Sequence, residues 1–153
     1  SEFATVIWVQ DEVAGVRLNR ISVVQRYADG KRHIVNGLFK GVAIKGGAVA
    51  TFWPAPKPYF VVVGEDSAEM HACLKQTDTY AGGCVVTADK QVKAVLPLEI
   101  YGVMANMSLA QLLADTRAID AALEKLGNRN EGEPVVNKLL TLFISLDRFG
   151  FMA

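Results

Sequence analysis

Side chains that could bind a metal ion or act as nucleophiles are few in this sequence. Its 153 residues include two histidines, His33 and His71, and two cysteines, Cys73 and Cys84. A hydrolytic metal centre needs several His, Cys, Asp or Glu ligands that converge on one ion. His71 and Cys73 stand two positions apart in a predicted helix, so they point to different sides of it. We therefore predict no metal ligand and no catalytic residue in this chain.

The serines, carboxylates and cysteines are explained by structural roles. No serine lies in the Gly-x-Ser-x-Gly sequence of a hydrolase nucleophile. Asp66 and Ser108 each open a capping-box pattern, in which Glu69 or Gln111 is expected to reach back to the start of the helix. Both cysteines are expected to be reduced, structural thiols, because two cysteines are far fewer than a disulfide-rich secreted scaffold contains.

One segment stands apart from ordinary strand and turn sequence. Residues 52–59 contain three prolines and three aromatic residues, which predicts a stiff extended loop with a large apolar surface. Such a loop is typical of a contact surface for a neighbouring domain, and a well-packed connection would have the same composition. The residues that we assign to a candidate interface are Arg26, Tyr27, Trp53, Lys57, Tyr59 and Phe60.

Composition and charge narrow the class of protein. Sixteen basic and sixteen acidic residues cancel and are scattered, so we expect neither nucleic acid nor a membrane surface as a partner. No apolar run approaches the roughly 20 residues that cross a bilayer, and no secretion signal is visible. We expect a cytoplasmic protein in which residues 1–3 are a leader introduced by cloning and residues 4–153 form a single domain.

The hydrophobic pattern predicts the elements of that domain. Strands are expected at residues 4–10, 18–27, 33–38, 46–51, 60–64, 84–87 and 92–96. Helices are expected at residues 66–79 and 109–126, and residues 135–144 are apolar enough for a short buried helix or strand. The fold class expected is α+β, with a mostly antiparallel β-sheet flanked by two or three helices. The apolar stripe of the second helix comprises Leu109, Leu112, Leu113, Thr116, Ile119, Ala122, Leu123 and Leu126.

Several short segments, taken in order and spacing, resemble the C-terminal domain of the bacterial adenine deaminases. The resemblance extends from about Leu18 to Gly127, with a fainter similarity at residues 146–150. The matching segments are residues 23–27 (VVQRY), 37–41 (GLFKG), 47–50 (GAVA), 61–64 (VVVG), 82–86 (GGCVV) and 96–104 (LPLEIYGVM).

The resemblance implies a parent enzyme whose chemistry takes place elsewhere. Members of this family are multidomain amidohydrolases that convert adenine and water to hypoxanthine and ammonia at a metal site in a separate (β/α)8 barrel. A divalent metal (Mn, Fe or Zn) is therefore expected only in a parent barrel domain, and no cofactor is expected in this chain. The family string His-Asp-Ser-His-Asn reads Ala-Pro-Lys-Pro-Tyr at residues 55–59, and a family Arg-His pair reads Arg26-Tyr27. No catalytic residue is carried over.

Three functions remain open from the sequence. In the first, the chain is the C-terminal domain of an adenine-deaminase-like amidohydrolase and is inactive alone, with the barrel domain as its partner. In the second, it is a free-standing binding or oligomerisation module that has lost deaminase chemistry and associates with itself. In the third, it is a small-molecule sensor with a pocket under the Pro-rich loop.

Overall fold

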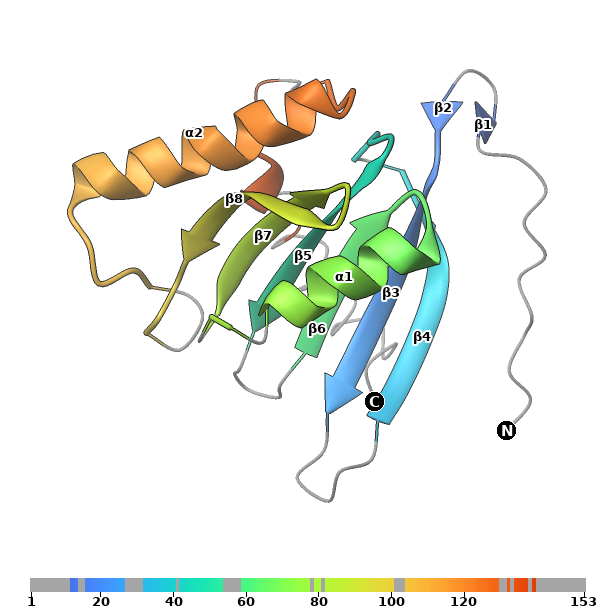
Figure 1. The fold of residues 1–153 in the computed structure, drawn as a ribbon, viewed down its shortest axis with the longest axis horizontal. Coiled ribbons are helices and arrows are strands. Elements are labelled where there is room, and N and C mark those ends of the chain that lie inside the picture. Colours follow the sequence, from blue (N-terminus) through green and yellow to red (C-terminus); the bar gives the residue numbers. More distant parts are fainter. Residues whose placement is uncertain are drawn as a thin grey trace.

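Six antiparallel strands form the centre of the structure, a computed structural model that describes residues 12–13, 16–26, 32–40, 42–53, 59–77, 79–80, 82–100, 104–129, 132, 134–137 and 139. The strand order across the sheet is β4-β3-β6-β5-β7-β8 (Figure 1). A short hairpin of β1 (Glu12–Val13) and β2 (Val16–Arg17) precedes this sheet. The six strands are β3 (Asn19–Arg26), β4 (Arg32–Phe39), β5 (Gly47–Trp53), β6 (Tyr59–Gly64), β7 (Gly83–Ala88) and β8 (Gln91–Pro97).

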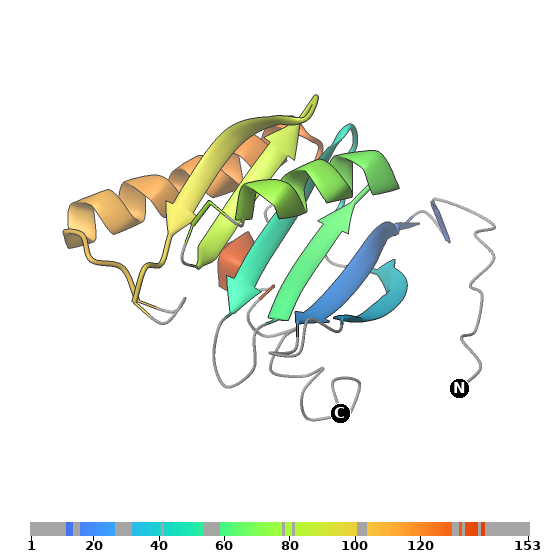
Figure 2. The ribbon, with the colours of Figure 1, turned by 60° about the horizontal axis from the view of Figure 1, so that its bottom comes forward.

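Helices cover the two faces of the sheet. Helix α1 (Ser67–Thr77) connects β6 to β7, and α2 (Leu109–Lys125) follows β8. Figure 2 shows α1 in front of the sheet and α2 behind β7 and β8. Because successive side chains of a strand point to opposite faces, Val62 packs toward α1 and Val63 packs toward α2. The sheet with helices on both faces confirms the predicted α+β class.

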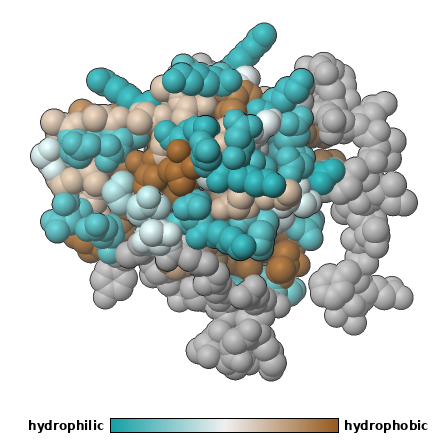
Figure 3. Space-filling view, viewed as in Figure 1, coloured by the Kyte–Doolittle hydropathy of each residue, from teal (hydrophilic) through white to brown (hydrophobic). Residues whose placement is uncertain are grey.

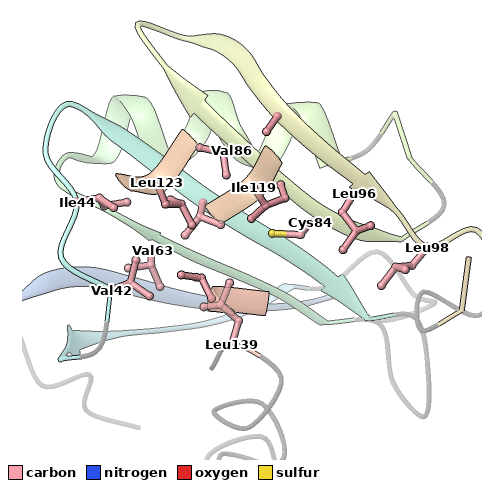
Figure 4. Close-up of a cluster of buried hydrophobic side chains, with 13 residues drawn as sticks. Val42, Ile44, Val63, Cys84, Val86, Leu96, Leu98, Ile119, Leu123 and Leu139 are labelled. Atoms are coloured by element: carbon pink, nitrogen blue, oxygen red, sulfur yellow. The ribbon is translucent and has the colours of Figure 1, made fainter. Parts of the chain in front are cut away.

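The larger of two apolar clusters lies between the sheet and α2 (Figure 4). Residues 135–137 and 139 are helical, which is one of the two structures expected for this segment, and Val135 and Leu139 complete the cluster. Burial of these side chains supplies the main favourable free energy of folding. The cluster consists of Val42, Ile44, Val49, Val63, Cys84, Val86, Ala94, Leu96, Leu98, Ile119, Leu123, Val135 and Leu139.

Small side chains allow α1 to approach the other face closely. Ala48 and Ala50 of β5 pack against Met70 and Cys73 of α1 in the second cluster. A Cβ atom placed on Gly64 would lie 2.6 Å from Cγ of Met70, so this position of β6 has no room for a side chain. The close approach of α1 therefore depends on alanine and glycine in the central strands.

Both predicted helix starts are confirmed, but the reciprocal half of each capping box is wrong. Oδ1 of Asp66 accepts hydrogen bonds from the amides of Ala68 and Glu69, and Oγ of Ser108 accepts one from the amide of Gln111. Glu69 does not reach back, because its carboxylate accepts from the Lys90 amide at 3.0 Å instead. Gln111 donates along the helix from Nε2 to Oδ1 of Asp115, at 2.7 Å.

The predicted apolar stripe of α2 is correct in the C-terminal half of the helix and wrong at its start. Ile119 and Leu123 are fully buried against the sheet. Leu109 is 70% exposed and Leu113 is 47% exposed. Consecutive helical residues differ by about 100° in direction, so these two leucines are turned roughly 80 to 120° away from Ile119. They lie about 40 and 80° from Leu123, at the edge of the buried stripe, and the sheet does not cover them.

Polar side chains hold the connection between β4 and β5 against the rest of the domain. The Asn19 side chain donates from Nδ2 to the carbonyl of Ile44 at 2.8 Å and accepts from the amide of Ile44 at 3.0 Å. The Lys45 amide donates to the carbonyl of Leu126 at the end of α2, at 2.8 Å. This connection is therefore bonded to both β3 and α2.

Most other predicted elements agree with the structure where it describes them. The 18–27 strand is observed as β3, and the first helix ends at Thr77, two residues earlier than predicted. Asp89 and Lys90 form a two-residue turn between β7 and β8 with φ of 53° and 58°, as in a type I′ hairpin. The predicted strand at residues 4–10 and the leader at residues 1–3 lie outside the described residues. Among the described helices, none is long and apolar enough to cross a membrane.

Candidate functional site

The candidate interface residues converge at one end of the sheet. In the strand register, Gln25 is the partner of both His33 and Tyr59, and Tyr59 is also the partner of Trp53. Positions 33, 25, 59 and 53 thus form one row across β4, β3, β6 and β5. Arg26 ends β3 in the adjacent row. Backbone pairing therefore brings Arg26, Trp53 and Tyr59 together, although they are up to 33 residues apart in sequence.

Two of these residues lie inside the domain. Tyr59 is 1% exposed and Phe60 is 4% exposed. The Phe60 ring stacks on that of Phe52, with centroids 4.4 Å apart and an interplanar angle of 24°. Tyr27 and Lys57 lie outside the described residues. For Arg26 and Trp53 the structure describes the backbone and not the side chain. The hypothesis that this end of the sheet is an interface stays a prediction.

The two histidines lie on opposite faces of the sheet. His33 pairs with Gln25, and both side chains lie on the face of the sheet that Ile21 shares and that α2 covers. His71 is exposed on α1, which covers the other face. Within the described ranges no three His, Cys, Asp or Glu side chains gather in a group that could hold a metal ion. The described residues therefore do not fit a hydrolytic metal centre.

The carboxylates at the start of α1 accept hydrogen bonds from the backbone. Oε2 of Glu65 accepts from the Gly46 amide at 2.6 Å, and Asp66 caps the helix. Glu69 is buried, and both of its carboxylate oxygens accept from the Lys90 amide in the β7–β8 turn. Glu65 thus connects the start of α1 to the β4–β5 connection, and Glu69 connects α1 to the β7–β8 turn. These contacts agree with the structural role that the sequence predicted for the carboxylates.

The two cysteines are free and lie in separate apolar clusters. Sγ of Cys73 lies 3.4 Å from the Val85 carbonyl under α1, and Cys84 packs under α2. Burial raises the pKa of Cys73 from its ordinary 9.0 to about 12, and burial also raises the pKa of Cys84. A thiol with a raised pKa is a poor nucleophile near neutral pH, so both cysteines have structural roles.

We expect neither thiol to react with a thiol-specific disulfide reagent at pH 8 in the native protein, and both to react in denaturant. An unfolded thiol ionises near pH 9, whereas folded Cys73 keeps its proton to about pH 12. The folded state then binds more protons across this interval, so the cysteines lower stability as pH rises above 9. Rapid labelling of one thiol in the native protein would contradict this assignment.

Several apolar residues of α2 are exposed, which was not predicted from the sequence. Besides Leu109 and Leu113, four alanines of the helix are exposed, together with Gln111, Arg117, Glu124 and Lys125. Figure 3 shows light brown, apolar atoms over α2 at the upper left, whereas α1 at the centre is largely teal. The spacing of Ala110, Ala114 and Ala118 could have indicated the row of exposed alanines, since residues four apart lie on one side of a helix.

Comparison with known proteins gives one family over nearly the whole chain. Residues 5–146 match the family described as the adenine deaminase C-terminal domain. The chain is 43% identical over 86 residues to the adenine deaminase of Oceanobacillus iheyensis, covering 56% of this chain and 15% of that protein. It is 32% identical over 131 residues to the adenine deaminase of Moorella thermoacetica, covering 84% of this chain and 22% of that protein. The chain thus spans about a fifth or less of these relatives.

Proposed function

Because the chain belongs to the adenine deaminase C-terminal domain family, we propose that it serves as the C-terminal domain of an adenine-deaminase-like amidohydrolase. The parent reaction would convert adenine and water to hypoxanthine and ammonia, in the cytoplasm and as part of purine metabolism. The observation that carries this proposal is the match over residues 5–146, combined with relatives of which the chain covers only 15% and 22%.

The proposal assigns the metal and the reacting atoms to the rest of the parent protein. Hydrolytic deamination needs an activated water, which a bound divalent metal supplies by lowering the pKa of that water. The two histidines of this chain face opposite sides of the sheet and cannot bind one ion together. A divalent metal (Mn, Fe or Zn) is therefore assigned to a barrel domain of the parent. This chain contributes a rigid, packed domain beside it.

The isolated chain is the sample that tests this assignment. We expect no hypoxanthine from adenine when the chain is supplied with Mn²⁺, Fe²⁺ or Zn²⁺, and no heat of binding on titration with adenine or hypoxanthine. Deaminase activity that follows the protein through gel filtration would overturn the proposal. Binding of adenine without turnover would favour the sensor function instead.

A second candidate, a self-associating module, is favoured by one specific observation. Helix α2 exposes Leu109, Leu113 and four alanines, which the described residues do not cover. Such a surface is typical of contact with another protein or domain. Light scattering distinguishes the two functions, because a module of this kind would form a stable dimer or larger species. The C-terminal domain of a longer enzyme would be monomeric when isolated.

A further inference from the structure

Strand β4 forms one edge of the six-stranded sheet, and this edge is long and regular (Figure 1). Its eight residues pair with β3 without a shift in register. Among the described strands, none pairs with the outer side of β4. Natural sheets protect an edge with a proline, a bulge or a very short strand, and β4 contains none of these. Its backbone amides and carbonyls can therefore bond to one further strand.

On one face of the sheet, β4 lies beyond the helix that covers the central strands. Helix α1 packs over β5, β6 and β7. Val62 packs toward α1, so its strand partner Ser22, and Asn36 opposite Ser22, lie on the same face. Two positions from Asn36 in either direction, Ile34 is 45% exposed and Leu38 is 43% exposed. We define the β4 strip as positions Arg32, Ile34, Asn36 and Leu38 of this strand, with Lys40 after them.

Basic residues lie at both ends of the β4 strip. Arg32 begins β4 and is the register partner of Arg26, the last residue of β3. Like charges directly opposite each other in a sheet are unfavourable, so this pair costs stability unless an anionic group lies beside it. Lys40 is exposed just after the other end of the strand. Neither β3 nor β4 contains an aspartate or a glutamate. The strip thus has two exposed apolar residues in its middle and positive charge at its ends.

This charge pattern disfavours a second copy of the chain and favours an acidic strand as the occupant. Two β4 strands paired about Asn36 would place Arg32 of each copy opposite Lys40 of the other, which is a repulsive pair at both ends. A nucleic acid carries a phosphate at every step and would set charges against Ile34 and Leu38. A strand with acidic residues at its ends and apolar residues between them matches the whole strip, which spans about 27 Å.

We propose that the outer edge of β4 binds an extended acidic segment of another protein as an added strand. Hydrogen bonds between the two backbones supply affinity, and the side chains of alternate residues supply specificity. Apolar side chains of the segment cover Ile34 and Leu38, and its terminal carboxylates pair with Arg32 and Lys40. The carboxylate beside Arg32 also offsets the repulsion between Arg32 and Arg26. The inference is independent of the proposed function, because it rests on β3 and β4 alone.

Binding is tested with a synthetic peptide that matches the length of the strip. It has glutamate at both ends, valine at every second position between them and threonine elsewhere, and a second peptide has lysine at both ends instead. We expect isothermal titration of the whole chain to show the glutamate peptide binding about tenfold more tightly than the lysine peptide, with a difference that shrinks as salt is added. Amide hydrogen exchange should slow in β4 on binding, and should not change in β8 at the opposite edge of the sheet.

Two variants with matched changes of charge locate the binding site. Ile34→Glu with Leu38→Glu should weaken binding of the glutamate peptide about tenfold, because it removes the apolar middle of the strip and adds like charges. Gln91→Glu with Val92→Glu is the control, because it adds the same charges at exposed positions of β8, the other edge strand. This control should bind the peptide as the unmodified chain does.

A third variant tests the ends of the strip without placing a charge in its middle. Arg32→Gln with Lys40→Gln should bind the glutamate and lysine peptides equally, and it decides the matter if the Ile34 and Leu38 variant does not fold. The proposal is overturned if the glutamate peptide does not bind, or if the β8 control weakens binding as much as the β4 variant. Equal binding of the lysine peptide to the unmodified chain overturns it too, as does tighter binding of a thymidine oligonucleotide.

Discussion

Gly83→Ala is expected to lower the free energy of unfolding by more than about 4 kcal/mol, enough to leave much of the protein unfolded. Gly83 begins β7 with φ of 108°, a conformation that residues with a side chain rarely adopt. A Cβ atom there would lie 2.0 Å from the carbonyl oxygen of Leu96 and 2.8 Å from the amide nitrogen of Leu98. Both atoms belong to the backbone next to β7, so neither can move without breaking the sheet.

Gly46→Ala is the matched control for Gly83→Ala. Gly46 also has positive φ, 69°, but no atom lies within 4 Å of the position that its Cβ would occupy. The cost of that substitution is the backbone conformation alone, about 1 to 2 kcal/mol. Urea unfolding followed by circular dichroism measures both variants. Equal effects of the two substitutions would show that the close contact at Gly83 does not limit stability.

Ile119→Ala is expected to lower the free energy of unfolding by about 2 to 5 kcal/mol. Ile119 is fully buried in the middle of α2 and contributes to the larger cluster on the sheet. Its removal leaves a cavity between rigid elements, which adds to the lost burial of the side chain. Leu109→Ala on the same helix should change stability by less than about 0.5 kcal/mol, because Leu109 is exposed.

Urea denaturation of these two α2 variants also distinguishes the two faces of the helix. A large loss of stability with Leu109→Ala would mean that Leu109 packs within the domain in solution. Leu109 would then not be available to a partner. A small effect of Ile119→Ala would instead show that the contact between α2 and the sheet contributes little to folding.

Local sequence signals predicted much of the fold because their causes are local. The Asp66 and Ser108 caps depend on contacts within a few residues, and the pairing of β7 with β8 depends on a short turn. The partner of Glu69 could not be predicted in this way. It is the amide of Lys90, which lies 21 residues away and is placed beside the helix by the packing of α1 on the sheet.

The apolar face of α2 shows a different limit of sequence patterns. The spacing of Leu109 and Leu113 predicts an apolar side of a helix, but it does not show where the sheet under that helix ends. Similarly, the sequence offered no means to place Arg26 and Trp53 at the same end of the sheet, because this depends on strand order. The family resemblance supplied the proposed function, which neither the pattern nor the fold class contains.

Adenine deamination by a graft, in which this chain replaces the matching segment of a relative, tests most directly the claim that this chain is a domain of a larger deaminase. The Moorella thermoacetica enzyme is prepared whole, without the matched segment, and with this chain in its place. We predict that the shortened enzyme loses activity, that the graft restores hypoxanthine formation, and that the chain alone forms none. The claim would be contradicted if the graft were no more active than the shortened enzyme under conditions in which the whole enzyme is active.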